Sequence, residues 1–309
     1  MKIFIIRLFA FIVDSNYRRC VIQIICNSHK NCKLKKIIEL FLEATDNDSY
    51  KEVLPYVKKH SNIIFPYDFT LEYNPRSIKV YRDSNNKGFM YVLHNGKKLY
   101  VKKEFKFSFQ VQSWYNGLLI EQDINSPHRY LTKERLPDMG SIVADIGGAE
   151  GIFALDIIDY VKKVYIFECD EKWIEALNLT FAPYKDKVEI VNKFVGDKTD
   201  NSMVRLDDFF KDKELDYIKA DIEGWEEKML FGARNILNNK VSKLLCCIYH
   251  RKDSEDFITE LLKNNGFSID INKGYIIFTP SEQVIGEPLS EPYLRHGVLY
   301  ASKEIGKIK

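Results

Sequence analysis

The feature that most constrains the fold of this chain is an apolar segment that contains an acid and runs into a loop of small residues, Val143-Ala-Asp-Ile-Gly-Gly-Ala-Glu-Gly151. A helical pattern follows it from Ile152 to Tyr160. Residues with little or no side chain allow a ligand to approach backbone N–H groups, which also lie at the positive end of the following helix. The segment therefore predicts a strand, a tight turn and a helix that bind a nucleotide-like ligand.

A second acid stands where such a site requires one. The next apolar segment, Val164-Tyr-Ile-Phe-Glu-Cys169, contains Glu168 roughly twenty residues after the loop, where a carboxylate can accept hydrogen bonds from both ribose hydroxyls. The loop reads D-x-G-x-A-x-G from Asp145 to Gly151, a pattern that resembles the first motif of S-adenosylmethionine-dependent methyltransferases. It differs from the G-x-G-x-x-G spacing of dinucleotide sites. A nicotinamide or other nucleotide, or a turn without a ligand, is the alternative.

The composition is that of a globular protein in a reducing compartment. The chain has 309 residues, enough for one large core and an accessory region, and its net charge of +2 gives no general attraction to nucleic acid. The six cysteines form no dense disulfide framework, which favours a cytoplasmic location. We expect Cys246 and Cys247 to be small buried hydrophobes. No common zinc spacing is matched by the group Cys20, Cys26, His29 and Cys32.

The N-terminal segment is apolar and then basic. Residues 1–13 include Arg7 and are fewer than the roughly twenty that span a bilayer, so no transmembrane helix is expected. No small-residue cleavage site follows, so a secretory signal is not expected either. Asp14 is the only acid before residue 37, so a basic amphipathic helix could contact a membrane surface. A helix packed on the main domain is the favoured interpretation.

Residues 1–138 are expected to form an accessory region. The pattern is mostly helical up to about residue 65, most clearly at 34–44, where apolar residues recur every three to four positions. Two alternating segments, 88–94 and 97–101, flank Asn95-Gly96, a two-residue turn that predicts a β-hairpin. A helix is expected at 118–125.

Residues 139–280 alternate between strand and helix patterns, which predicts an α/β domain with a mostly parallel sheet and helices on both faces. Ligands of such sheets bind at the carboxyl ends of the strands. Residues 281–309 are expected to be a C-terminal tail. The expected strands are 141–146, 164–169, 188–195, 216–222 and 243–249 with a final pair at 268–272 and 275–279, and the expected helices are 151–161, 171–181, 226–237 and 254–265.

The ordered series of motifs resembles the FkbM-type methyltransferase family over about residues 126–280. The resemblance implies a Rossmann-like class I methyltransferase fold with a mostly parallel seven-stranded sheet. It also implies S-adenosyl-L-methionine as the cofactor and methyl transfer to oxygen, often a sugar hydroxyl of a surface glycan. The chain departs from the family at Glu150 and Cys169, where Asn and Pro are more common. The matching segments are Asp145-Ile-Gly-Gly-Ala-Glu-Gly151, Glu168-Cys-Asp170, Val195-Gly-Asp197, Leu206-Asp-Asp208, Lys219-Ala-Asp-Ile-Glu-Gly224, Glu226, Gly232-Ala233, Ile248-Tyr-His-Arg251 and Tyr293-Leu-Arg-His-Gly-Val-Leu-Tyr300.

The loop chemistry and the resemblance together define the expected cofactor site. Glu168 is expected to bind the ribose and Asp197 the adenine amino group. His128 and Arg129 form either a lid over the cofactor or a plain connector, and Lys219, in a strand, is expected to snorkel or to pair with an acid. The expected cofactor-binding residues are Asp145, Gly147, Gly148, Ala149, Gly151, Glu168, Cys169, Asp197 and Asp221.

Methyl transfer to a hydroxyl requires help in removing its proton, because the pKa of a sugar hydroxyl is close to that of water, about 15.7. Asp221, Glu223 and His250 follow the fourth and fifth strands and are the expected catalytic residues; a histidine base would titrate near about 6.5. Asp221 could instead bind the methionine amino group, Glu223 could cap a helix and His250 could be structural. No metal is expected; the alternative is a magnesium site of Asp207, Asp208 and Asp221.

The sequence thus predicts a cytoplasmic O-methyltransferase whose partner is a small-molecule or glycan acceptor. Two other functions stay open at this point. One is a catalytically silent S-adenosylmethionine-binding scaffold in a glycan-assembly complex, and the other is a nicotinamide-dependent oxidoreductase.

Overall fold

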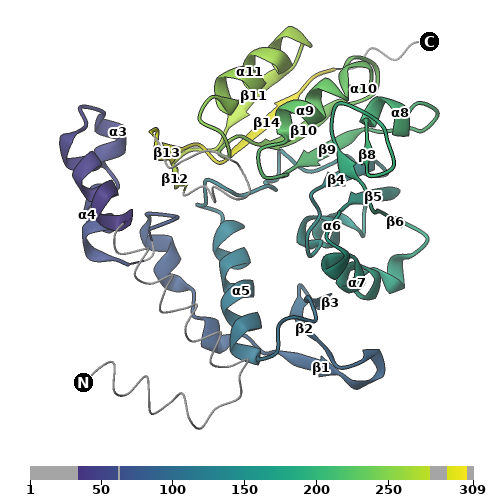
Figure 1. The fold of residues 1–309 in the computed structure, drawn as a ribbon, viewed down its shortest axis with the longest axis horizontal. Helices are drawn as coiled ribbons and strands as arrows, with labels where there is room; N and C mark the ends of the chain where they lie inside the picture. The colour runs from purple at the N-terminus through teal and green to yellow at the C-terminus, as the bar shows by residue number, and fades with distance from the viewer. Residues whose placement is uncertain (1–33, 62, 279–290, 305–309) are drawn as a thin grey trace. The chain divides into compact units, whose positions relative to one another are not determined.

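The computed structural model shown in Figure 1 describes residues 34–61, 63–278 and 291–304. It divides into two compact units, Met1–Tyr67 and Asp68–Lys309. The N-terminal basic segment up to residue 33 and the group Cys20, Cys26, His29 and Cys32 lie outside the described residues. Over the part of the chain that is described, no helix has the length and apolar character needed to cross a membrane.

The described part of the first unit is helical. Residues 34–44 form a helix, as their periodicity predicts, and Ile38 and Leu42 lie buried one turn apart on it. Two short helices follow, α3 (Asp48–Lys51) and α4 (Leu54–Lys59). The Lys35 ammonium donates a hydrogen bond to the carbonyl of Lys58 at 3.1 Å, which connects the first helix to the end of α4.

The second unit begins with the predicted hairpin. Asn95 and Gly96 have φ values of 49° and 80°, as a type I′ turn requires, and His94 pairs with Lys97 across it. The Tyr100 N–H donates to the Thr180 hydroxyl at 3.0 Å, so the hairpin packs on the helical layer of the main domain. The strands of this small sheet are β1 (Tyr81–Asp83), β2 (Phe89–His94) and β3 (Lys97–Tyr100), and 3₁₀ turns lie at Asp68–Glu72, Pro75–Ser77 and Ser84–Asn86.

Helix α5 spans Ser108–Glu121, so the helix predicted at 118–125 begins and ends earlier than expected. It begins early because the Gln110 side chain accepts the Phe107 N–H and fixes the first turn. It ends early because the Asp123 carboxylate accepts the Asn125 N–H, which forms a turn that competes with the helix.

The main sheet has seven strands in the order β11-β14-β10-β9-β4-β5-β6, which confirms the predicted mostly parallel sheet. Adjacent strands from β10 to β6 run parallel, and β14 runs antiparallel to both of its neighbours. The strands are β4 (Ile142–Ile146), β5 (Lys163–Phe167), β6 (Val188–Val191), β9 (Tyr217–Ala220), β10 (Lys243–Cys247), β11 (Ser268–Ile271) and β14 (Val298–Ser302).

Helices cover both faces of the sheet, and each face has its own core. Strand β4 alternates between them: Ala144 packs with the core under α9, α10 and α11, and Val143 packs with the core under α5, α6 and α7 (Figure 1). The helices are α6 (Ile152–Ile157), α7 (Glu171–Thr180), α8 (Leu206–Phe209), α9 (Glu226–Phe231), α10 (Arg234–Asn239) and α11 (Ser254–Asn264), with a 3₁₀ turn at Ala182–Tyr184.

The C-terminal part of the sheet differs from the prediction. The predicted pair of strands at 268–272 and 275–279 does not form in the described structure. Segment 268–272 is β11, which pairs with β14. The other segment contains β12 (Ile276–Ile277), which pairs with β13 (Leu294–Arg295). The expected tail at 281–309 therefore contains a strand of the central sheet. A second small sheet joins β7 (Phe194–Val195) to β8 (Met203–Val204).

The division of the chain also differs from the prediction. The compact units separate at residue 67, not at 138, because the hairpin and α5 pack against the sheet domain. The helix predicted at 226–237 is two helices, α9 and α10, interrupted at Gly232-Ala233. The break places Gly232 against the backbone of Gly196, where an added Cβ would lie 2.0 Å from the carbonyl oxygen.

Gly232→Ala is expected to lower the free energy of unfolding by more than about 2 kcal/mol, because the new methyl group would overlap a backbone oxygen that cannot rotate away. Gly117→Ala, inside α5 with nothing within 4 Å of the added Cβ, is the control and should raise stability by about 0.5–1 kcal/mol. Urea denaturation measures both, and equal effects would contradict the close approach.

Candidate active site

The small-residue loop after β4 is folded tightly against the end of β9. Gly147 has a φ of +73°, and a Cβ added to it would lie 1.9 Å from the carbonyl oxygen of Asp221. Ala149 also adopts a left-handed conformation, with a φ of 44°. Gly151 begins α6 with a φ of +87°, and a Cβ there would meet the ring of Phe181. Contacts within the protein therefore require glycine at positions 147 and 151, whether or not a ligand binds to the loop.

A buried ion pair lies directly below the loop. Lys219 and Asp145 are register partners on β9 and β4, and their Nζ and Oδ1 atoms are 3.1 Å apart. Asp145 is fully buried and Lys219 is 4% exposed. Burial opposes the charge on Lys219, but Asp145 and Asp221 together outweigh burial and raise the pKa of the ammonium. The prediction that Lys219 pairs with an acid is confirmed, and Nζ also donates to the Gly147 carbonyl at 2.8 Å.

Glu168 connects the loop to the end of β5. One carboxylate oxygen accepts the Ala149 N–H at 2.8 Å, and the other accepts the N–H groups of Cys169 and Asp170 at the same distance. A carboxylate has about four lone-pair sites, so it can still accept from hydroxyls of a ligand. Glu168 thus fixes the loop and faces the adjoining cavity at the same time.

Two cavities meet at the carboxyl ends of the central strands. The first, of about 480 Å³, extends from the loop toward Glu168, Cys169 and Trp173 and on to Phe194. The second, of about 200 Å³, extends from the loop to Leu118 and Glu121 of α5 and to His128 and Tyr130. Both are lined by Gly147, Ala149, Asp221 and Glu223.

The second cavity is strongly acidic. Burial and the neighbouring carboxylates raise the pKa of Glu121 to about 8, and burial raises that of Glu150 to about 7. Together with Asp221 and Glu223, these side chains give the cavity wall an affinity for cations. Glu121 carries no sequence signal for a site residue, because it ends a helix that precedes the sheet domain and belongs to none of its motifs. Glu150 stands out in the sequence only as a departure from a family pattern.

Asp221 occupies the junction between the two cavities. Burial opposes its ionisation, but His250 and Lys219 outweigh that effect and lower its pKa to about 2. The Tyr130 hydroxyl donates to Asp221 Oδ2 at 2.5 Å, and His128 Nε2 lies 3.7 Å from the same oxygen. His128 thus lies at the cavity wall rather than in a plain connector, and burial lowers its pKa to about 4.

Arg129 does not reach the site as a lid residue would. Its guanidinium donates to the backbone carbonyls of Leu131 and Gln122, and these hydrogen bonds stabilise the segment that contains His128.

His250 is held as a cation rather than as a free base. Its Nδ1 lies 2.9 Å from Glu226 Oε1, and its Nε2 lies 3.4 Å from Asp221 Oδ1 and 3.7 Å from Glu223 Oε2. Burial would lower its pKa, but these three carboxylates outweigh burial and raise the pKa to about 9. The expected titration near about 6.5 is therefore wrong for this position, because His250 is protonated at neutral pH.

Glu223 projects into the junction from a strained backbone. Its φ is 54°, in the left-handed region that a non-glycine residue adopts at a cost of roughly 1–3 kcal/mol. The side chain is 66% exposed and lines both cavities, and burial of its inner part raises the pKa of the carboxyl. It does not cap a helix: in the described structure, the first turn of α9 has no side-chain cap.

Several expected site residues lie elsewhere. Asp197 is exposed and lines neither cavity, and Asp145 and Gly151 support the loop from behind. Gly148 lines the second cavity and Cys169 the first. The magnesium set does not form, because Asp207 accepts the N–H groups of Asn235 and Ile236 at the start of α10, and Asp208 accepts from the Thr199 hydroxyl. Cys246 and Cys247 are buried, as expected.

Part of the sheet domain is similar to a known protein family. Residues 168–269 match the methyltransferase FkbM domain. This match confirms the predicted resemblance over that part of the chain. The strand order, with β14 antiparallel between β11 and β10 at one side of an otherwise parallel sheet, agrees with the predicted Rossmann-like fold. No curated protein matches the chain.

Solved structures give weaker similarities. The methyltransferase FkbM from Methylobacillus flagellatus KT is 20% identical to this chain, with a TM-score of 0.44. The match covers 63% of this chain and 53% of the Methylobacillus chain, so this chain spans about half the length of that protein. A putative methyltransferase from Streptococcus mutans in complex with SAH is 14% identical over 55% of this chain and 92% of that one, with a TM-score of 0.38. A putative RNA methyltransferase from Pyrococcus horikoshii is 15% identical over 55% and 76%, with a TM-score of 0.36.

Lys219→Met is expected to destabilise the fold by about 3–5 kcal/mol, because it leaves the Asp145 carboxylate buried without its counter-charge. The double variant Lys219→Met with Asp145→Asn removes that charge and should recover part of the loss. Thermal denaturation of the two variants and the parent checks this. If the single variant is as stable as the parent, the ion pair does not hold β4 and β9 together.

Proposed function

We propose that the protein is an S-adenosylmethionine-dependent methyltransferase that methylates a hydroxyl group of a small-molecule or glycan acceptor. The observation that carries this proposal is the pair of cavities that meet at Asp221 and Glu223, with acids along both walls. The cofactor has two cationic groups, its sulfonium and its ammonium, and an uncharged adenosine. The FkbM domain match supports the same activity.

The residues fit the cofactor part by part. The first cavity offers Glu168 for the ribose hydroxyls and apolar walls of Phe167, Phe194 and Val195 for the adenine. The second cavity offers Glu121 and Glu150 for the ammonium. When bound, the cofactor supplies an electrophilic methyl group on a sulfonium. Asp221, ionised at neutral pH, provides a negative charge at the junction of the two cavities.

We assign the proton acceptor to Glu223. It is the partly exposed carboxylate at the junction, whereas His250 carries a proton of its own and is enclosed by three carboxylates. His250 instead acts as a positioning residue, because its charge attracts both Asp221 and Glu223. The acceptor hydroxyl would lose its proton to Glu223 while the methyl group approaches in line.

The oxidation state of the cysteines bears on where the protein is located. Three cysteines in the described residues, Cys169, Cys246 and Cys247, are free thiols, which supports a cytoplasmic location.

A silent scaffold would bind the cofactor without turnover on any acceptor. An oxidoreductase would bind a dinucleotide in preference to S-adenosylhomocysteine, and the loop sequence Gly147-Gly-Ala-Glu-Gly151 does not have the G-x-G-x-x-G spacing of dinucleotide sites.

Glu168→Gln is expected to weaken S-adenosylhomocysteine binding by about 1.5–3 kcal/mol, the range for a hydrogen bond to a charged group. Isothermal titration calorimetry measures the change. Glu175→Ala, at an exposed position of α7, removes the same charge outside both cavities and should bind like the parent. Unchanged affinity in a folded Glu168→Gln protein would place the cofactor elsewhere.

Glu223→Gln is expected to lower kcat by about 10²–10⁴-fold with nearly unchanged cofactor affinity, because it removes the base and retains the shape. In the parent enzyme kcat should rise with pH through a value above the ordinary pKa of glutamate, about 4.3, and level off. Methyl transfer to a panel of nucleotide sugars and glycans provides the assay. A rise centred near pH 9 that His250→Gln abolishes would assign the proton to His250 instead.

A further inference from the structure

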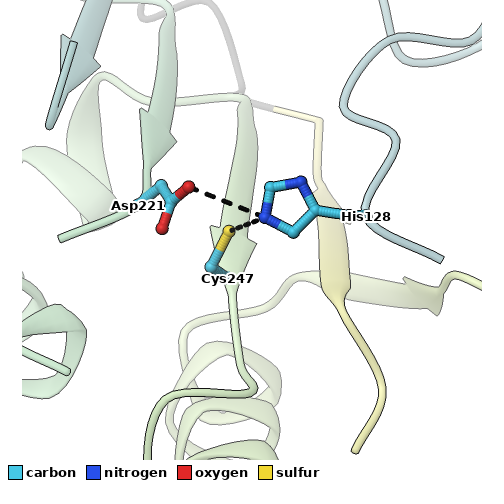
Figure 2. A group of neighbouring side chains, drawn as sticks. All are labelled: His128, Asp221 and Cys247. Carbon is cyan, nitrogen blue, oxygen red and sulfur yellow. Dashed lines mark hydrogen bonds and ion pairs between the residues drawn. The ribbon is translucent and has the colours of Figure 1, made fainter. Parts of the chain in front are cut away.

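Three potential metal ligands of different chemistry converge beside the second cavity. Figure 2 shows His128, Asp221 and Cys247 pointing toward one another from three segments: the connector before β4, the end of β9 and the end of β10. His128 Nε2 lies 3.7 Å from Asp221 Oδ2 and 3.9 Å from Cys247 Sγ. The three ligand atoms lie within 4.8 Å of one another.

The 3.7 Å between His128 Nε2 and Asp221 Oδ2 suits a shared ion better than a direct hydrogen bond, and the 3.9 Å between His128 Nε2 and Cys247 Sγ is a long sulfur contact. An N–H···O hydrogen bond has its heavy atoms about 2.7–3.2 Å apart, which is closer than the histidine and the aspartate approach. Two ligands of a tetrahedral zinc ion, with bonds of about 2.0–2.3 Å, lie roughly 3.3–3.6 Å apart. The two distances from His128 Nε2, 3.7 and 3.9 Å, exceed this by a few tenths of an ångström, and the Asp221 and Cys247 ligand atoms lie within 4.8 Å of each other, so side-chain rotations would complete the geometry.

The cluster is enclosed and its backbone is fixed. His128 is 4% exposed and Cys247 is 1% exposed. The Asn272 amide donates to the carbonyls of Pro127 and Arg129, on either side of His128, at 2.9 Å each. Tyr130 donates to Asp221 and so orients it, as the outer shell of a metal site does. Tyr249 Oη lies 3.2 Å from His128 Nε2, and an ion would displace that contact.

A second set of candidate ligands, Asp221, Glu226 and His250, is less suitable. His250 Nδ1 and Glu226 Oε1 are already 2.9 Å apart, which leaves no room for an ion between them. Glu226 Oε1 also accepts the Ile222 N–H at 3.0 Å.

We propose that His128, Asp221 and Cys247 bind one divalent cation of the zinc class. A thiolate, an imidazole and a carboxylate together suit zinc or cobalt and not magnesium or calcium. Cys247 releases its thiol proton to solvent as the thiolate binds. Lys219, the cation beside this cluster, is already paired with Asp145. Three protein ligands leave one position open, next to the cavity that His128 and Asp221 line, where an oxygen of water or of an acceptor could be polarised.

Cobalt titration of the chelator-treated full chain tests the site. Bound Co²⁺ shows a thiolate-to-metal charge-transfer absorption in the near ultraviolet when a cysteine coordinates it. We expect one equivalent to produce this band, and Zn²⁺ to remove it by displacement. To exclude other thiols of the N-terminal segment, the titration uses a full-length background in which Cys20, Cys26 and Cys32 are replaced by serine.

Cys247→Ser should abolish the band and weaken zinc binding by on the order of 100-fold or more, and His128→Gln should weaken it similarly. Cys246→Ser is the matched control, because Cys246 is equally buried but faces the opposite core, and should leave the band intact. A band that survives Cys247→Ser, or no band in the background protein, would overturn the proposal. So would metal binding that His250→Gln abolishes and His128→Gln does not. The metal site is a proposal separate from methyl transfer. S-adenosylhomocysteine affinity is therefore measured in parallel, so that loss of the metal site can be distinguished from failure of the proposed methyltransferase function.

Discussion

The ion pair between Lys219 and Asp145 is the interaction on which the site depends. It joins the two central strands at matching positions, and the same ammonium binds the carbonyl of Gly147, so a contact between strands also sets the shape of the loop above it. The loop in turn receives Glu168 from β5 and contacts Asp221 after β9. Three strand ends are therefore held at fixed distances by a few polar contacts, and both cavities form around them.

Charge in the site is arranged in layers. The innermost layer is a balanced pair, Asp145 with Lys219, and the next is an excess of carboxylates, partly offset by the His250 cation. Because their pKa values are raised to about 8 and about 7, Glu121 and Glu150 hold protons that a cationic ligand can displace, so the acidic walls favour such a ligand. This preference does not depend on which acceptor receives the methyl group.

The sequence was sufficient for features that arise from local patterns, and insufficient for features that arise from distant contacts. The hairpin at Asn95-Gly96 and the strands from β4 to β10 follow from turn chemistry and apolar periodicity. The insertion of β14 beside β10 could not be predicted, because strand pairing is decided by partners far apart in the chain. The same is true of the site: the position of Glu168 was predictable from spacing, whereas the protonation of His250 depends on Glu226, Asp221 and Glu223 gathering around it. Asp207 is a candidate ligand by its residue type, but it lies in α8 and accepts the N–H groups of Asn235 and Ile236 at the start of α10, which gives it a structural role.

The position of β14 has a consequence for the order in which the sheet assembles. Strand β11 is synthesised before β14, yet in the described sheet it pairs with β14 and not with β10. During synthesis, β10 therefore presents an unpaired apolar edge, containing Leu244 and Leu245, while β11 waits in solution without a partner. The nascent chain has to avoid direct pairing between β10 and β11. Strand β14, antiparallel to both, can take its place between them only after more than twenty further residues have left the ribosome.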